Sequence, residues 1–309
     1  MDRRHFTYFL AVVESNSISE AARQLHISQP AISQSIKELE REFRTPLFHR
    51  GPRLTLTAAG RALVGPARRT LRSFESARAA VEEIDHLATG RLDLAVVQGF
   101  AVDPVVPLVT RFRARYPGLH ISVHEAPSGP DGFEVLRRAE AELLVSDHPA
   151  PYPKHEAVGL AVEEMLVVFP PQTEDLPDGP MHVAELREHR MLQGLPRHSE
   201  MSVWFTSVLA AERLPPPSIV VETAHRDAIV PLVLSGAGAA VLPAPVARAA
   251  KRLGAQVRAL AITFPRPCFL YHRTGPLAPA SLAFVAMAAD AAPPGAGRPG
   301  AGEVTQGRG

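Results

Sequence analysis

The strongest constraint on the fold lies in the first 43 residues, where apolar residues recur at helical spacing in three short stretches. Residues three and four apart share one face of an α-helix, so each stretch predicts an amphipathic helix. Short turns separate the stretches, which brings the helices together around one small core. Their apolar members are Phe6, Phe9, Leu10 and Val13, then Ile18, Ala21, Ala22 and Leu25, and finally Ile32, Ile36, Leu39 and Phe43.

The second and third predicted helices carry start signals. Ser17 is followed three residues later by Glu20, the spacing of a capping box, in which each side chain satisfies an orphan backbone donor. Ser28 is placed to cap the third helix, and Pro30 is tolerated in its first turn. Residues 26–28 leave room only for a tight bend. Together these signals predict a helix-turn-helix.

The third predicted helix is polar on the face opposite to Ile32 and Leu39. Glutamine and serine side chains can hydrogen-bond to base edges in a major groove. Any three-helix unit displays polar residues outward, but the ordered conjunction of capped helix, tight turn and glutamine-led helix favours DNA binding. The residues expected to contact DNA on this helix are Ser28, Gln29, Pro30, Ser33, Gln34 and Lys37.

Residues 47–50 and 53–56 flank Gly51-Pro52 and predict a β-hairpin with Arg50 and Arg53 at its tip, a wing that would contact phosphates. The charge distribution agrees with this interpretation. Residues 1–72 hold 12 Lys and Arg against 6 Asp and Glu, whereas the remaining residues hold 21 against 26. A basic segment on a mildly acidic body favours a polyanionic partner, here double-stranded DNA, although a solvated basic surface would have the same composition.

Thr57 is placed to cap a long helix from Ala58 to about Leu87. Its apolar stripe recurs every three or four residues, as in a coiled coil, and a partner chain's identical helix could cover it. We therefore expect a homodimer through this linker. Arg68, Arg69 and Arg72 either supplement phosphate contacts or line a solvated face. The stripe consists of Leu63, Ala67, Leu71, Phe74, Ala77, Val81, Ile84 and Ala88.

Residues 19–33, SEAARQLHISQPAIS, closely resemble the LysR-type transcriptional regulators, as do residues 36–40, 46–48 and 56–60. The resemblance extends over nearly the whole chain. It implies a bacterial winged-helix repressor or activator, cytoplasmic, with a dimerising linker helix, a small-molecule effector and a homotetrameric assembly. Phe43-Arg44 and Gln34 depart from the usual pattern, which leaves the fold intact and the base specificity open.

Strand and helix patterns alternate from residue 91 to residue 291, which predicts open parallel sheets in two α/β lobes. The expected strands are 92–97, 119–124, 142–145, 165–169, 218–221, 239–242 and 267–271. The expected helices are 104–116, 133–141, 181–188, 202–213, 226–235 and 278–287. The resemblance implies a periplasmic-binding-protein-like domain in which the chain crosses between lobes near 159–161 and returns near 261–263.

The predicted organisation is therefore an α+β winged helix-turn-helix head, a long linker helix and an α/β two-lobed effector domain. The head spans 1–57, the linker 58–89 and the effector domain 90–291, with lobe I at 90–160 and 265–291 and lobe II at 161–264. Residues 292–309 are expected to form a flexible tail, because 9 of the last 19 residues are Gly or Pro.

Ligands of two-lobed α/β folds bind where strand carboxyl ends and helix amino ends meet, and helix amino ends favour anions. We expect a small, anionic effector between the lobes, although the same residues could be ordinary loop positions. Phe100 hints at an apolar or aromatic effector, or at a hydrophobic lid. The candidate contacts are Gln98, Gly99, Phe100, Ala101, Ser128, Ser199, Ser202, Thr223, His225 and Arg226.

Other chemistries find little support. The single cysteine, Cys268, excludes an internal disulfide and a thiolate zinc cluster, and we expect it at the edge of the first lobe. On a strand, His120 and His124 stand roughly 13 Å apart, too far to share a metal. No nucleophile or acid–base constellation can be assembled, so we expect no enzyme, cofactor or metal site. The sequence has no apolar run long enough to span a membrane, and its first residues lack the apolar region of a secretion signal. We therefore expect a cytosolic protein.

Two alternatives to an effector-controlled regulator stay open at this point. One is a constitutive DNA-binding protein whose second domain only oligomerises. The other is an α/β enzyme with a DNA-binding head. Effector identity, operator sequence and the direction of regulation are not encoded in any motif.

Overall fold

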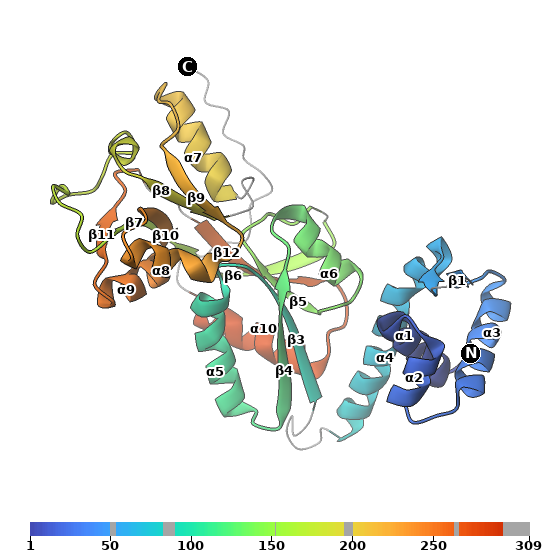
Figure 1. Ribbon diagram of the computed structural model, residues 1–309. Helices are drawn as coiled ribbons and strands as arrows, with labels where there is room; N and C mark the ends of the chain where they lie inside the picture. The colour runs from blue at the N-terminus through green and yellow to red at the C-terminus, as the bar shows by residue number, and fades with distance from the viewer. Residues whose placement is uncertain (50–53, 83–89, 152, 195–199, 263–265, 293–309) are drawn as a thin grey trace.

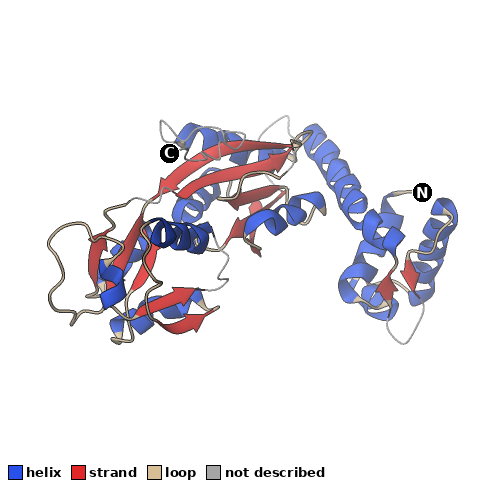
Figure 2. Ribbon diagram, turned by 90° about the horizontal axis from the view of Figure 1, so that it is seen from above, coloured by secondary structure: helices blue, strands red, loops and turns tan. Residues whose placement is uncertain are grey.

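The computed structural model describes residues 1–49, 54–82, 90–151, 153–194, 200–262 and 266–292, and among these the side chains of 75–82 and 200–204 are left undescribed. The amino-terminal head lies at one end and the two-lobed body at the other, with α4 (Ala58–Glu82) leading from the head toward the body (Figures 1 and 2). The described part of the chain has no helix long and apolar enough to cross a membrane.

The head contains the three expected helices and the short hairpin. Its elements are α1 (Arg3–Ser15), α2 (Ile18–Gln24), α3 (Gln29–Phe43), β1 (Phe48–His49) and β2 (Thr55–Leu56). The two strands pair antiparallel, with Phe48 opposite Leu56. Phe9 and Ile32 are fully buried at the centre of the core and anchor α1 and α3 to each other. The apolar stripes therefore form the core that their spacing predicts, except for Phe43, which is 39% exposed.

The helix starts differ from the sequence prediction in detail. The Ser17 hydroxyl accepts the Glu20 N–H at 3.3 Å, but the Glu20 carboxylate accepts hydrogen bonds from Arg23 and Gln24, so the reciprocal half of the predicted capping box is replaced. Ser28 stands at the N-cap of α3 but makes no capping side-chain bond. An unexpected reciprocal cap joins Asp2 and His5 at the start of α1.

Helix α4 begins as predicted, because the Thr57 hydroxyl accepts the Gly60 N–H at 3.0 Å. Its stripe, however, is not one continuous dimer seam. Leu63, Ala67 and Leu71 pack into the core of their own head. Phe74 is 50% exposed and is the one member of the stripe, among those with described side chains, that is left uncovered. Ile84 and Ala88 lie outside the described residues.

Arginines on α4 contact carboxylates of the same chain. Arg68 lies 3.5 Å from Glu140, and Arg72 lies 3.9 Å from Glu142. The Arg69 guanidinium donates to the Arg137 carbonyl at 3.3 Å. Arg69 is exposed, as expected for a solvated face, whereas Arg68 and Arg72 are half-buried against carboxylates, and the expected phosphate contacts stay a prediction.

Lobe I contains a five-stranded sheet in the order β4-β3-β5-β12-β6. The sheet is mixed rather than parallel, because β12 runs antiparallel to both of its neighbours. Helices α5 and α10 pack against each other through Phe112 and Phe284, and α6 lies on the other side of the sheet (Figure 1). The strands are β3 (Gly90–Val97), β4 (Leu119–Ala126), β5 (Leu143–Ser146), β6 (His155–Glu163) and β12 (Arg266–Arg273); the helices are η1 (Ala101–Val105), α5 (Val106–Arg115), η2 (Gly129–Phe133), α6 (Glu134–Arg137) and α10 (Pro279–Ala291).

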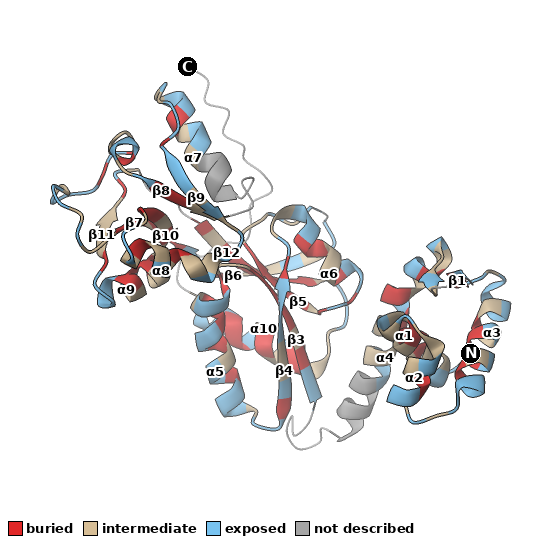
Figure 3. Cartoon of the chain, in the orientation of Figure 1, coloured by how far each residue is buried: buried red, intermediate tan, exposed pale blue. Residues whose placement is uncertain are grey.

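Lobe II contains an antiparallel sheet, β10-β7-β11, and a separate parallel pair, β8-β9, again different from the parallel sheet expected. Its strands are β7 (Met165–Phe169), β8 (Met191–Gly194), β9 (Ile219–Thr223), β10 (Ala240–Pro243) and β11 (Gln256–Ala259). Its helices are η3 (Glu185–Glu188), α7 (Glu200–Ala211), η4 (Arg226–Ala228), α8 (Ile229–Leu234) and α9 (Ala244–Arg252). Figure 3 shows the buried residues following the strands of both lobes.

The sequence prediction missed the strands β6, β8 and β11, whose pairing partners are distant in the chain. It also missed the helix α9. It also misplaced Cys268. Because β12 lies between β5 and β6, this cysteine is fully buried inside the sheet rather than at an edge. Burial raises the pKa of its thiol well above the usual value, so the reactive thiolate is disfavoured there.

Candidate functional site

The outward face of α3 carries most of the side chains predicted to contact DNA. Gln29, Gln34 and Lys37 are exposed, as are Ser28 and Pro30, whereas Ser33 is half-buried. Two glutamines are oriented by neighbours: Ser19 donates its hydroxyl to Gln29 Oε1 at 3.1 Å, and Gln34 donates to Glu38 Oε1 at 2.8 Å. Arg50 and Arg53 lie outside the described residues.

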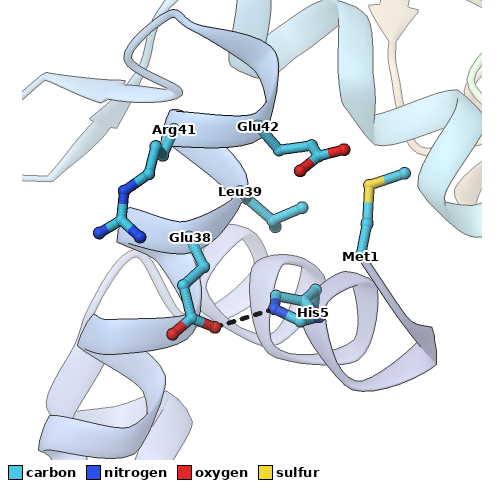
Figure 4. A pocket seen from close by; sticks show the side chains of 6 residues that line it. All are labelled: Met1, His5, Glu38, Leu39, Arg41 and Glu42. Carbon is cyan, nitrogen blue, oxygen red and sulfur yellow. Dashed lines mark hydrogen bonds and ion pairs between the residues drawn. The ribbon is translucent and has the colours of Figure 1, made fainter.

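A hollow of about 300 Å³ lies between α1 and α3, next to this face (Figure 4). His5 from α1 reaches Glu38 of α3, with Nε2 and Oε2 3.1 Å apart, and its other ring nitrogen lies 2.8 Å from Asp2. Glu38 thus binds both Gln34 and His5. This contact ties the outward-facing helix α3 to α1.

A larger cavity of about 490 Å³ lies between the lobes, and we call it the interlobe cavity. Lobe I supplies a mostly polar side, formed by Gln98, Gly99, Ser128, Gly129, Pro130, Asp147 and Arg266. Lobe II supplies a mostly apolar side, formed by Met165, Met191, Leu192, Gln193, Gly194, Phe205, Thr206, Leu209, Pro216, Pro217, Ile219, Arg226, Ile229, Val241, Leu242, Pro243 and Val246. The volume is in the range of small-molecule sites.

Some candidate effector contacts line this cavity and others do not. The lining includes Gln98, Gly99, Ser128 and Arg226. Phe100 is absent from the lining: it is fully buried beneath the Arg266 guanidinium, 3.9 Å from the ring centroid, so it acts neither as a contact nor as a lid here.

The remaining candidates either lie outside the cavity lining or have side chains that the structure does not describe. Ala101 is exposed in η1 and does not line the cavity. Thr223 and His225 also lie away from it, where the Thr223 hydroxyl accepts the His225 N–H at 3.0 Å. Ser202 belongs to α7, but its side chain, like all of Ser199, lies outside the described residues.

Three charged residues that the sequence analysis did not single out meet at the junction of the lobes, and we call them the hinge cluster: Arg266, Asp147 and Glu163. Arg266 Nε lies 2.6 Å from Asp147 Oδ2, and Arg266 Nη1 lies 3.5 Å from Glu163 Oε2. All three side chains are less than a tenth exposed. Glu163 ends β6 and Arg266 begins β12, at the end of the sheet where the chain passes from lobe I to lobe II after β6 and returns before β12.

The hinge cluster contains two carboxylates and one guanidinium, so one negative charge is not balanced within it. Neither carboxylate oxygen of Glu163 has a hydrogen-bond partner among the described residues. Burial raises the pKa of Glu163 to about 7, with Asp103 and Asp147 adding to the increase and Arg266 opposing it. Glu163 therefore exchanges a proton near neutral pH, whereas the tightly paired Asp147 neutralises Arg266.

The Arg266 guanidinium lies so close to the backbone at position 99 that only glycine fits there without strain. The φ of Gly99 is +109°, and a Cβ at this position would lie 2.9 Å from Arg266 Nη1. A side chain would therefore strain the backbone and displace the guanidinium. A charged residue at the end of a buried strand, next to each expected lobe crossing, was the sequence signal that could have identified Glu163 and Arg266.

The described residues offer no grouping of three or more His, Cys, Asp or Glu side chains that could hold a metal ion. His120 and His124 have other partners: His120 lies 3.2 Å from the Ser122 hydroxyl, and His124 lies 3.7 Å from Asp93. The interlobe cavity can thus bind and orient a ligand through its arginine and amide groups.

Comparison with known protein families gives matches over most of the chain. Residues 85–293 match the family model described as "LysR substrate binding domain". Residues 3–61 match "Bacterial regulatory helix-turn-helix protein, lysR family". The two matches correspond to the body with the interlobe cavity and to the head with α3.

Individual relatives agree. The chain is 30% identical over 251 residues to the nitrogen assimilation regulatory protein nac of Escherichia coli, covering 80% of each. It is 27% identical over 256 residues to the transcriptional activator IlvY of Salmonella typhimurium, covering 79% of this chain and 82% of that protein.

Solved structures show the same fold. Full-length CbnR complexed with its target DNA superposes with a TM-score of 0.66 at 25% identity, covering 94% of this chain and all of CbnR. A full-length OxyR variant from Pseudomonas aeruginosa superposes with a TM-score of 0.71 at 20% identity, covering 94% of each chain. The arrangement of head, linker helix and two lobes is therefore a recurring one.

Proposed function

This chain belongs to the LysR family of bacterial transcriptional regulators, and from that premise we propose that α3 reads a specific operator while a small organic acid in the interlobe cavity controls the outcome. The chain is a regulator of transcription and not an enzyme. The observation that carries the proposal is the pairing of an exposed polar helix in the head with a ligand-sized cavity between two lobes.

The DNA contacts divide into two kinds. Gln29, which is exposed, and Ser33, which is half-buried, lie near the start of α3, the end that enters a major groove in helix-turn-helix proteins, so we assign them to base contacts. Lys37, farther along the helix, and Arg50 and Arg53 in the hairpin segment are assigned to phosphates. Ser28 and Pro30 support the approach at the amino end, and Gln34 is held by Glu38 next to the same groove.

The effector contacts that we retain are Gln98, Gly99, Ser128 and Arg226, because these line the interlobe cavity. A ligand that touches both lobes stabilises one relative lobe orientation, and that orientation can bias the spacing of two heads in an assembly. Typical allosteric coupling of about 1–3 kcal/mol alters operator affinity roughly 5-fold to 150-fold.

A homodimer through α4, paired into a homotetramer by the effector domains, is the assembly that we propose. Phe74 supports it, because a half-exposed phenylalanine on a coiled-coil stripe is an expected interface residue. We place the protein in the cytoplasm, where its DNA lies.

The test has two stages. Purified full-length protein is used to select binding sites from a random DNA library, and operator affinity is then measured in the presence of a panel of metabolites that is also screened by thermal melting. A metabolite that raises the melting temperature and changes operator affinity supports the proposal. Operator binding that no ligand changes would indicate a constitutive DNA-binding protein instead.

A further inference from the structure

The two sides of the interlobe cavity differ in chemistry. On the lobe II side, the lining includes Phe205 and Leu209 of α7, Ile219 of β9, Ile229 of α8 and Val246 of α9, which together form an apolar wall. On the lobe I side, the lining is formed by amide, hydroxyl and charged groups. A ligand that fills both sides must itself be amphipathic.

Two guanidinium groups line the cavity, but they are not equivalent. Arg266 is already neutralised, because it lies 2.6 Å from Asp147 and 3.5 Å from Glu163, and its plane rests on the Phe100 ring. A ligand anion beside Arg266 would also meet the charge of Asp147, which itself lines the cavity. Arg266 is therefore a poor receptor for a second carboxylate.

Arg226 has the opposite character. Its Nε is buried and has no hydrogen-bond partner among the described residues. Burial and the nearby Arg266 lower the pKa of Arg226, which indicates a cation that lacks full compensation. Its side chain packs against Gly194, since a Cβ there would lie 3.8 Å from Arg226 Cγ. A buried, unsatisfied donor on a cation is stabilised by a ligand anion.

We infer that the effector is a monoanionic carboxylic acid with an apolar body, its carboxylate paired with Arg226 and its body against the apolar wall of lobe II. This inference rests on the proposed function and defines the ligand class of that site. A cation that lacks full compensation calls for one negative charge, and sugars, phosphates and dicarboxylates are disfavoured because their far ends would be buried against the apolar wall without partners.

The test uses matched probes on the full-length protein. Octanoate, 3-phenylpropionate and benzoate combine a carboxylate with an apolar body, octanamide keeps the body without the charge, and acetate keeps the charge without the body. Affinities are measured by calorimetry and thermal melting. We expect at least one of the three acids to bind at least 10-fold more tightly than octanamide or acetate.

Two variants localise the binding. Arg226→Gln should weaken the best acid at least 10-fold and leave octanamide unchanged, and Ile219→Ser, at a position that is 37% exposed, should weaken the acid and octanamide alike. Arg248→Gln, at an exposed position of α9 outside the cavity lining, is the matched control and should change neither affinity. Melting of each ligand-free variant checks that it is folded.

Three outcomes would overturn the inference: no binding by any of the three acids, equal binding of octanamide, or an unchanged affinity in Arg226→Gln. The proposed function fails separately. If the acids bind as expected but operator affinity never responds to any ligand, the ligand class holds and the regulatory role does not. If an organic acid outside this class controls operator binding while the three probe acids fail, the inference is wrong and the proposed function stands.

Discussion

Glu163 and Arg266 stand directly opposite each other on neighbouring strands, at the end of β6 and the start of β12, with Oε2 and Nη1 3.5 Å apart. The chain leaves lobe I after Glu163 and re-enters it at Arg266, so a change in lobe orientation must act on this pair. The pair is buried, and Asp147 takes the stronger contact with the guanidinium. The junction between the lobes thus contains a buried carboxylate, Glu163, whose negative charge Arg266 balances only in part.

The first prediction is that Glu163→Gln changes the pH dependence of stability. The pKa of Glu163 is raised from 4.5 to about 7 in the folded chain, so the folded state binds more protons than the unfolded state between these values. Stability therefore falls as the pH rises from about 4.5 to about 7, then levels off. The variant should match the wild type near pH 4.5 and exceed it by roughly 2–3 kcal/mol above pH 7.5.

Urea unfolding across this pH range measures the difference between the two proteins. Glu125→Gln, at an exposed position near the end of β4, is the control for replacing a carboxylate by an amide. A difference between Glu163→Gln and wild type that does not vary with pH would mean that folding does not change the pKa of Glu163.

A second prediction separates base contacts from phosphate contacts on α3. Gln29→Ala should cost about 1–3 kcal/mol on the selected operator and little on random DNA, because glutamine reads a base edge. Lys37→Ala should weaken binding to both DNAs and reduce the salt slope by about one unit, because it removes one phosphate contact. Equal losses on both DNAs for Gln29→Ala would remove Gln29 from the set of base contacts. Fluorescence anisotropy over a salt series measures both effects.

The third prediction concerns assembly. Phe74→Asp should shift the protein toward smaller species in sedimentation velocity, because an aspartate in the dimer seam would bury an unpaired charge. The head should remain folded, since Phe74 lies outside its core. Leu253→Asp, at a position that is 67% exposed in lobe II, serves as the control for an added surface charge. An unchanged distribution for Phe74→Asp would place the dimer contact elsewhere.

The fourth prediction compares two glycines with similar backbones. Gly99 and Gly254 have φ of +109° and +104°, but an added Cβ meets Arg266 Nη1 at 2.9 Å only at Gly99, and nothing within 4 Å at Gly254. Each substitution by alanine should carry a backbone cost of about 1–3 kcal/mol. Gly99→Ala should also displace Arg266, so its loss of unfolding free energy should be the larger. Equal losses would show that the guanidinium moves freely.

Local sequence determined the head. Apolar spacing predicted α1, α2 and α3, and Thr57 marked the start of α4, because helix faces and caps depend on residues three or four apart. The same local logic placed Gln29 and Lys37 on the outer face of α3. It failed at Ser28, whose capping bond is absent, because capping depends on side-chain rotamers as well as on residue type.

Tertiary structure decided the rest. The stripe of α4 is periodic in sequence, but only packing shows that Leu63 and Leu71 belong to the head and Phe74 does not. Arg266 and Asp147 are 119 positions apart, and no local pattern links them. Their pairing, the burial of Phe100 and the orphan Nε of Arg226 depend on strands that meet only in the folded sheet, because desolvation and charge pairing act through space rather than along the chain.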